Sequence, residues 1–215
     1  MRILVLAKAP VPGRVKTRLQ PPLTPAQAAD VAAAALHDTL SAAVVSGASE
    51  WVLALDGSPG PWLAPGWRVI QQRGTTFAER LSAAWADCAG PTLQIGMDTP
   101  QVTGALLDDA MGLLDEHDCV LGPASDGGWW ALGLRAAEPN AFHDVPMSTP
   151  TTCVHQLQRL RELGLSPKKL PTLTDVDTWI DALEVAAVAS GTRFAAVVDD
   201  LRTSLPISAG PRSTR

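Results

Sequence analysis

Short apolar runs alternate with longer amphipathic or alanine-rich segments along most of this chain, and Pro, Gly and Asp residues stand between them. The runs have the length of buried strands, and capping boxes such as Thr24 with Gln27 start the longer segments as helices. The predicted strands cover residues 2–7, 51–55, 67–71, 92–96 and 119–123. The predicted helices cover residues 24–47, 76–90, 103–117, 149–163, 178–189 and 193–201. Such alternation favours right-handed crossovers, so we expect an α/β fold with a mostly parallel, Rossmann-like sheet and helices on both faces.

The alternation breaks at the sequence "ASDGGWWALGLR", residues 124–135. Asp126, Gly127 and Gly128 form a turn signal between two strand-like runs, and no helical segment separates those runs. We therefore expect an antiparallel insertion in the otherwise parallel sheet.

The length of 215 residues and the hydrophobic content of 46% are enough for one sizeable core, so we expect a single domain over residues 1–202. Residues 203–215 have the composition of a disordered tail. Cys88, Cys119 and Cys153 are widely spaced and odd in number, which favours buried thiols over disulfides or a zinc site. The apolar run at the N-terminus is too short for a signal peptide or a membrane span, so a cytoplasmic location is expected.

The charge is distributed unevenly along the chain. The formal net charge of −5 argues against a nucleic-acid-binding protein, which normally carries a broad basic face. Residues 1–29 nevertheless contain five basic and no acidic side chains. A local positive charge of this kind suits a small polyanionic ligand.

Most of this charge lies in "KAPVPGRVKTRL", from Lys8 to Leu19, directly after the first predicted strand. Arg14, Lys16 and Arg18 are two residues apart, so an extended backbone would point all three in the same direction. We interpret the loop as a phosphate-binding segment; the alternative is a solvated basic loop. It lacks the G-x-x-x-x-G-K-[ST] spacing of a P-loop.

Asp98 stands where the buried strand 92–96 opens into a loop, which is a suitable place for a metal-binding carboxylate. The alternative is a turn or cap residue before the next helix. Asp175 and Asp177 are two residues apart on an extended segment, so either could be a second ligand. The same segment has the composition of a helix N-cap.

The insertion supplies further candidates. Asp126 is either a general base or a residue that shapes the turn. Trp129 and Trp130 would point to opposite faces of a strand, so one could face a cleft while both could equally be packing residues.

Six sequence blocks occur in a characteristic order, namely "KAPVPGRVKTRL", "ERL", "IGMDTPQVT", "LGPASDGGWWALGL", "STPTT" and "DVDT". Together they resemble the DUF2064 family of bacterial glycosyltransferase-A-like proteins, in the nucleotide-diphospho-sugar transferase superfamily, over residues 2–183. The resemblance implies a glycosyltransferase-A-type sheet with a nucleotide over the loop after the first strand. It also implies a divalent metal, Mg²⁺ or Mn²⁺, at the end of the fourth strand.

The resemblance also implies roles for single residues. Asp98 takes the place of the metal-binding aspartate, and Asp177 matches the second aspartate in the "VDTPEDL" ending of CMP-KDO synthetase-like nucleotidyltransferases. Trp129 and Trp130 stand where a Tyr pair is usual and would line the acceptor pocket. The expected nucleotide- and phosphate-binding residues are Lys8, Gly13, Arg14, Lys16, Arg18 and Arg80.

Three functions agree with these residues. On the resemblance, the first is a metal-dependent glycosyltransferase that uses a nucleotide-sugar and a small-molecule acceptor, with Asp126 as the base. The second is a nucleotidyltransferase, in which an anionic acceptor attacks a nucleoside triphosphate and pyrophosphate leaves; the absence of a D-x-D pair at Asp98 favours it. The third is a non-catalytic nucleotide-binding module. The base, the sugar, the acceptor and the oligomeric state stay open.

Overall fold

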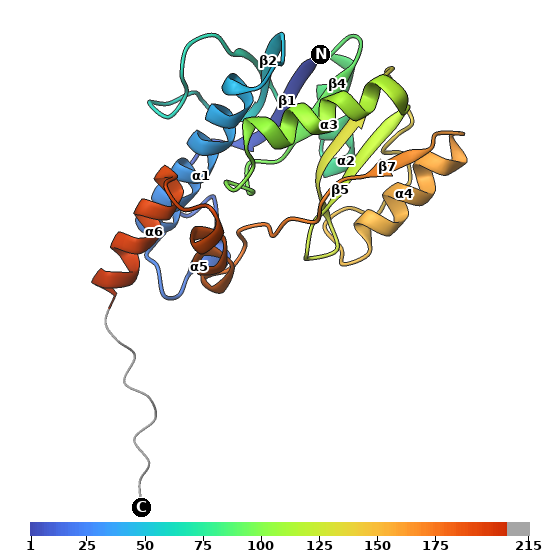
Figure 1. The fold of residues 1–215 in the computed structure, drawn as a ribbon. Helices are drawn as coiled ribbons and strands as arrows, with labels where there is room; N and C mark the ends of the chain where they lie inside the picture. The colour runs from blue at the N-terminus through green and yellow to red at the C-terminus, as the bar shows by residue number, and fades with distance from the viewer. Residues whose placement is uncertain (206–215) are drawn as a thin grey trace, which may run out of the picture.

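The computed structural model describes residues 1–205, in which the strands form one seven-stranded sheet of order β3-β2-β1-β4-β6-β5-β7 (Figure 1). The strands are β1 (Arg2–Lys8), β2 (Glu50–Asp56), β3 (Arg68–Gln71), β4 (Thr92–Ile95), β5 (Cys119–Pro123), β6 (Trp129–Leu134) and β7 (Pro167–Lys169). The helices are the 3-10 helix η1 (Thr17–Leu19), α1 (Pro25–Val45), α2 (Phe77–Ala86), α3 (Gly104–Glu116), α4 (Thr152–Glu162), α5 (Trp179–Val188) and α6 (Arg193–Ser204).

Strand β6 runs antiparallel to both of its neighbours, β4 and β5, while the other neighbouring strands are parallel. The predicted α/β fold and its antiparallel insertion are therefore confirmed. The short strand β7 was not predicted, because "PKK" has neither the length nor the apolar pattern of a strand. Helix α4 begins three residues later than predicted, since Thr149 and Thr152 form a hydrogen-bonded turn around Pro150 instead.

The central strand β1 explains how the layers are held together. Its side chains alternate between two hydrophobic clusters, with Ile3 and Val5 on one face of the sheet and Leu4 and Leu6 on the other. Helices α1 and α3 cover the first face, and α2 and α4 cover the second. A strand buried on both faces must be apolar throughout, which is why β1 reads as a continuous hydrophobic run.

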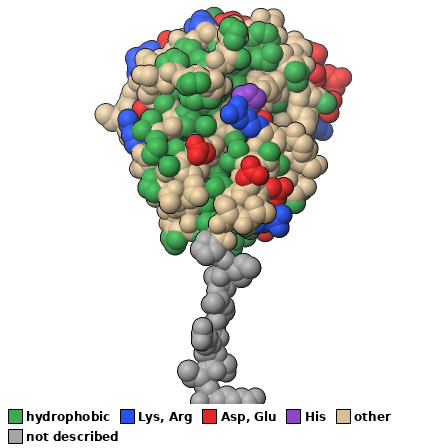
Figure 2. Space-filling view, turned by 90° about the vertical axis from the view of Figure 1, so that its left-hand side faces the viewer, with side chains coloured by type: hydrophobic (Ala, Val, Ile, Leu, Met, Phe, Trp, Pro, Cys, Tyr) green, Lys and Arg blue, Asp and Glu red, His purple; other side chains and the backbone are tan. Residues whose placement is uncertain are grey.

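Helices α5 and α6 pack against the outer side of α1 and form a third cluster there. Among the helices of residues 1–205, α1 alone is long and apolar enough to cross a membrane, but 61% of its apolar window is buried, as in a core helix. Figure 2 views this side of the molecule and shows hydrophobic side chains over much of it, with charged groups scattered between them. Helix α6 ends at Ser204, inside the expected tail, and residues 206–215 of that tail lie outside the described residues.

The three cysteines are buried, as predicted. Burial raises the pKa of each thiol, that of Cys119 to about 11. The thiols therefore stay protonated and pack as small apolar groups.

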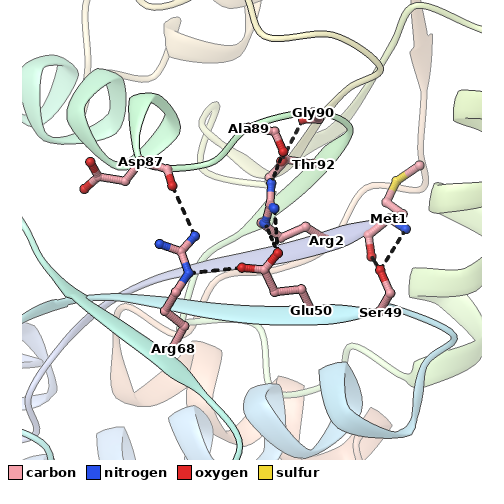
Figure 3. A network of polar contacts seen from close by, with 9 residues as sticks. All are labelled: Met1, Arg2, Ser49, Glu50, Arg68, Asp87, Ala89, Gly90 and Thr92. Atoms are coloured by element: carbon pink, nitrogen blue, oxygen red, sulfur yellow. Dashed lines mark hydrogen bonds and ion pairs between the residues drawn. The ribbon is translucent and has the colours of Figure 1, made fainter.

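A polar network ties together the amino ends of the first three strands (Figure 3). Glu50 Oε2 accepts a 2.8 Å hydrogen bond from Arg2 Nε, and Glu50 Oε1 accepts a 3.0 Å bond from Arg68 Nε. Arg2 and Arg68 also donate to the backbone carbonyls of Ala89 and Asp87, just after α2. The network thus fixes the register of β1, β2 and β3 at the edge of the sheet opposite the strands' carboxyl ends.

We predict that Glu50→Gln lowers thermal stability at pH 7 by about 1 kcal/mol, since Glu50 is partly exposed. Hydrogen bonding from Arg2 holds the pKa of Glu50 below its ordinary value of 4.5. The stabilisation is therefore fully present above pH 4.5 and is lost as the pH falls through the lower, folded-state pKa. Melting curves from pH 7 downward should show the parent and variant converging. Glu116→Gln, an exposed carboxylate with no ion pair among residues 1–205, is the control, and equal stability of parent and Glu50→Gln at pH 7 would contradict the prediction.

Candidate active site

A cleft of about 510 Å³ opens at the carboxyl ends of the central strands. It is lined by the loop after β1, by residues after β3 and β4, and by the turn between β5 and β6. The charged side chains that line it are Lys8, Arg14, Lys16, Arg18, Arg80, Asp98, Asp126, Asp175 and Asp177. The structure therefore brings together all of the predicted charged residues, although they come from segments far apart in the sequence.

The basic loop does not have the extended backbone on which its common orientation was predicted. Lys16 is in the left-handed region, with φ 49° and ψ 39°, and the 3-10 helix η1 begins at the next residue. Arg14, Lys16 and Arg18 still line the same cleft, but a compact turn places them there. A non-glycine residue in this backbone region is strained, and such strain is common at functional sites.

Lys16 is the most buried of these cations and lies between two carboxylates. Its side chain is only 8% exposed, and its Nζ is 2.8 Å from Asp98 Oδ1 and 3.4 Å from Asp177 Oδ1. The contact with Asp98 is an ion pair, whereas the contact with Asp177 also has the geometry of a hydrogen bond. Arg18, which is exposed, donates to the other oxygen of Asp177 at 3.2 Å.

Electrostatics keeps this lysine charged. Burial alone would lower the pKa of Lys16, but the negative charges of Asp98 and Asp177 outweigh it and raise that pKa above 10.5. Asp175 stands beside this cluster without an ion pair to it among residues 1–205. Burial, together with the charges of Asp98 and Asp126, raises the pKa of Asp175 to about 7.

Two hydrogen bonds to backbone carbonyls hold the two acidic segments together. The Val176 N–H donates to the Asp98 carbonyl at 2.9 Å, and Gln101 Nε2 donates to the Thr174 carbonyl at 2.7 Å. Thr178 caps helix α5 in a capping box with Asp181. Thr178 is therefore the N-cap of this segment, and the Asp177 carboxylate is not needed as a cap and contacts Lys16 instead.

Asp98 and Asp177 are two carboxylates that could hold a divalent cation together, since both contact Lys16 Nζ. Within residues 1–205, no group of three or more His, Cys, Asp or Glu side chains is arranged to enclose a metal ion. Two carboxylates are enough for Mg²⁺, which takes waters and phosphate oxygens as its remaining ligands. Asp98 Oδ1 is buried, and the group that contacts it is the Lys16 ammonium, which a divalent ion could replace. These donors therefore fit a divalent ion that binds together with phosphate.

Asp56, at the end of β2, is an acidic partner that the sequence reasoning missed. Its carboxylate lies 3.9 Å from Arg14 and 4.0 Å from Arg80, at the limit of an ion pair. Arg80 projects from α2, and its Nε is buried without a partner in the described part of the chain. Both arginines are thus held near the cleft by weak contacts that an anionic ligand could replace.

The turn between β5 and β6 is shaped as its sequence predicts. Asp126 Oδ1 accepts a 2.7 Å hydrogen bond from the Gly128 N–H, which agrees with the interpretation of Asp126 as a turn-shaping residue. Gly127 has φ +90°, and a Cβ there would lie 1.9 Å from the Pro150 carbonyl oxygen, so only glycine fits. Asp126 also lines the cleft.

The two tryptophans point to opposite faces of the sheet, as predicted. Trp130 is 1% exposed in one core cluster and donates to the Pro171 carbonyl at 2.9 Å, so it is largely a packing residue. Trp129 packs on the other face, stacked on Phe142 with ring centroids 6.3 Å apart, and is the more exposed of the two. Of the pair, Trp129 is the better candidate for ligand contact.

Gly13 is the one predicted phosphate-binding residue that does not line the cleft. Its φ of +76° makes it a turn residue, so its contribution to the loop is conformational. The sequence reasoning also missed several residues that line the cleft, and three of them are notable. They are Gln72 after β3, Phe77 at the start of α2, and Ser148, which has φ +59°. The positive φ of Ser148 could not be predicted, because serine is not a residue type that favours this backbone conformation.

Comparison with known proteins relates this chain to nucleotide-dependent transferases. A protein-family model described as "Uncharacterized protein conserved in bacteria (DUF2064)" matches residues 25–149. A 3-phospho-D-glycerate guanylyltransferase from Phenylobacterium zucineum (strain HLK1) is 32% identical over 207 residues, covering 87% of this chain and 91% of that protein.

Solved structures share the fold. A protein from Desulfovibrio desulfuricans G20, described as a nucleotide-diphospho-sugar transferase, has a TM-score of 0.84 at 24% identity and covers 94% of this chain and 95% of its own. A Mycobacterium tuberculosis H37Rv protein, Rv0371C, solved in complex with manganese, has a TM-score of 0.51 at 21% identity, covering 86% of this chain and 96% of its own. The predicted glycosyltransferase-A-type fold and the assignment as a transferase are confirmed.

We predict that Lys16→Met destabilises the protein by about 1 to 3 kcal/mol, because it leaves Asp98 and Asp177 facing each other without their ammonium. This is less than the roughly 3 to 5 kcal/mol of a fully buried pair, since both carboxylates are more than one third exposed. Mg²⁺ or Mn²⁺ should restore part of the loss by replacing the missing cation. Melting curves with and without metal test this, with the exposed Arg18→Met as control. A Lys16→Met variant as stable as the parent and indifferent to metal would contradict the account of the cluster.

Proposed function

This chain belongs to the DUF2064 family, and on that premise we propose that it is a metal-dependent nucleotidyltransferase. In this reaction an anionic oxygen of the acceptor attacks the α-phosphorus of a nucleoside triphosphate. A bond forms from that oxygen to the α-phosphorus, the bond from the α-phosphorus to the bridging oxygen breaks, and pyrophosphate leaves. The observation that supports the proposal is the buried Lys16 between Asp98 and Asp177, where an ammonium that could bind phosphate lies against two carboxylates that could bind a divalent ion.

Nucleotidyl transfer fits better than the glycosyl transfer that the resemblance placed first. The relative at 32% identity is named as a guanylyltransferase, which favours GTP as the donor. Gly96 and Met97 precede Asp98, so the chain lacks the D-x-D pair that is common in metal-dependent glycosyltransferases. The transferase assignment also leaves the non-catalytic module without support.

The cations of the cleft suit a triphosphate and its departing pyrophosphate. A phosphate oxygen would replace the carboxylates as the partner of Lys16. A second phosphate oxygen would replace Asp177 as the partner of the exposed Arg18. Arg14 and Arg80 have only distant ion pairs with Asp56, so turning to phosphate costs them little. Each such charge-assisted bond contributes about 1.5 to 3 kcal/mol.

Asp98 and Asp177 would hold the divalent ion. When bound, Mg²⁺ or Mn²⁺ would neutralise phosphate charge and stabilise the charge that develops on the leaving pyrophosphate. The chain's own contribution is to keep the two carboxylates side by side, through the Val176 to Asp98 backbone bond, before any ligand arrives. Lys16 stabilises that arrangement in the free protein.

The chemistry of the acceptor decides whether a general base is needed. A phosphate or carboxylate acceptor is already ionised near pH 7, so it can attack without giving up a proton. An acceptor hydroxyl in glycosyl transfer would need a base, and Asp126 was the candidate. The hydrogen bond from Gly128 to Asp126 supports a structural role for this residue instead.

We predict that the protein releases pyrophosphate from GTP in the presence of Mg²⁺ or Mn²⁺ and 3-phospho-D-glycerate, or a similar small phosphorylated or carboxylate acceptor. Asp126→Asn should stay within a few-fold of the parent rate, because Asn keeps the Oδ1 that accepts from Gly128 and no base is required. Loss of a working general base would instead cost about 10²- to 10⁴-fold.

The measurement is a coupled pyrophosphate assay, with nucleotide-sugars tested in parallel for release of nucleoside diphosphate. Turnover of a nucleotide-sugar with no pyrophosphate from any nucleoside triphosphate, together with an inactive Asp126→Asn, would return the assignment to glycosyl transfer.

A further inference from the structure

Gln72 is a cleft residue that the mechanism above does not use. It follows β3 directly, and its side chain reaches across the carboxyl ends of two neighbouring strands. Its Nε2 donates to the Ala7 carbonyl of β1 at 2.9 Å and to the Ala54 carbonyl of β2 at 3.0 Å. The two bonds fix both the position of the side chain and the orientation of its amide.

The orientation follows from the count of donors. A primary amide has two N–H groups, and both are used on backbone carbonyls, so the opposite orientation would place the amide oxygen against two acceptors. The remaining polar atom is Oε1. It accepts no hydrogen bond within residues 1–205 and is not among their buried unpaired atoms. Gln72 therefore presents to the cleft a fixed acceptor that cannot become a donor.

The order of the strands places Gln72 Oε1 on one side of the cleft, away from the other candidate site residues. Gln72 lies on the β2–β3 side of β1, whereas Asp98 follows β4 on the other side, and Trp129 is on β6 beyond it. The basic loop after β1 lies between them. If the phosphates occupy the middle and the acceptor substrate occupies the β6 side, the nucleoside extends toward Gln72. Leu6 and Phe77 are apolar residues that line the same cleft.

We propose that Gln72 selects the nucleobase of the donor, with Oε1 accepting a hydrogen bond from a ring N–H or amino group. The inference rests on the proposed nucleotidyltransferase function. Guanine fits this acceptor best, because its N1–H and 2-amino group are two adjacent donors on one edge. Adenine has an acceptor nitrogen in place of N1–H and offers only its 6-amino group as a donor beside it, and hypoxanthine keeps N1–H but lacks the 2-amino group.

The test is calorimetric binding of GTP, ITP and ATP to the parent protein with Mg²⁺ and without acceptor, so that no transfer occurs. The parent should bind GTP more tightly than ATP, and more tightly than ITP, by roughly three- to tenfold for each donor lost. In Gln72→Leu, affinities for the three nucleotides should converge, because the phosphate contacts stay. Gln71→Leu is the matched control, since Gln71 is exposed and its side chain, among residues 1–205, bonds only the Gly57 carbonyl at 3.3 Å.

The outcomes separate this inference from the proposed function. Equal affinities of the parent for GTP, ITP and ATP would overturn the role of Gln72, whether or not Gln72→Leu folds. Base preference that persists in a folded Gln72→Leu variant would overturn it as well. Binding of none of the three nucleotides would overturn the nucleotidyltransferase proposal itself.

Discussion

The ion cluster of Lys16, Asp98 and Asp177 is the interaction on which the site depends. Two carboxylates converge at the carboxyl end of the sheet, where one oxygen of each lies within 3.4 Å of Lys16 Nζ, and their like charges are stabilised by that cation between them. In the free protein the Lys16 ammonium is that cation. Its position costs free energy, because the lysine is buried and its backbone is in the left-handed region. The site is therefore already formed for a cation and a polyanion, and ligand binding exchanges partners instead of building the site.

The two ends of the sheet differ, with a paired polar network at the amino ends of the strands and the candidate site at their carboxyl ends. At the amino ends of β1, β2 and β3, Glu50 is hydrogen-bonded by Arg2 and Arg68 (Figure 3). At the carboxyl ends, the charges of Arg14 and Arg80 are only loosely paired. Because β6 is antiparallel, its turn reaches this same end and adds Asp126 and Trp129 as a wall of the cleft.

The sequence correctly predicted the features that depend on residues close together in the chain. The capping boxes at Thr24 and Thr76 formed, and so did the turn at Asp126, because each needs only neighbouring residues. Asp98 and the basic loop were placed in one site because strand ends meet at one edge of a parallel sheet. The roles assigned to single residues there stay predictions.

What the sequence could not predict depends on contacts between distant segments. The extended backbone assumed for Lys16 was wrong, because pairing with Asp98 and Asp177 selects a turn that local propensity disfavours. Asp56 and Gln72 were missed for the same reason. Asp56 matters only once Arg14 and Arg80 lie beside it, and Gln72 matters only once β1 and β2 present their carbonyls to it.

The central claim is that Asp98 and Asp177 bind a divalent ion together with the triphosphate, and a Mn²⁺ titration with and without GTP tests it most directly. The parent should bind Mn²⁺ weakly alone, because Lys16 occupies the carboxylates, and much more tightly with GTP. Asp98→Asn and Asp177→Asn should lose this tightening while melting as folded proteins, and Asp175→Asn should keep it. An Asp98→Asn variant that binds Mn²⁺ and GTP like the parent would contradict the account, because Asp98 would then be a turn residue and not a metal ligand.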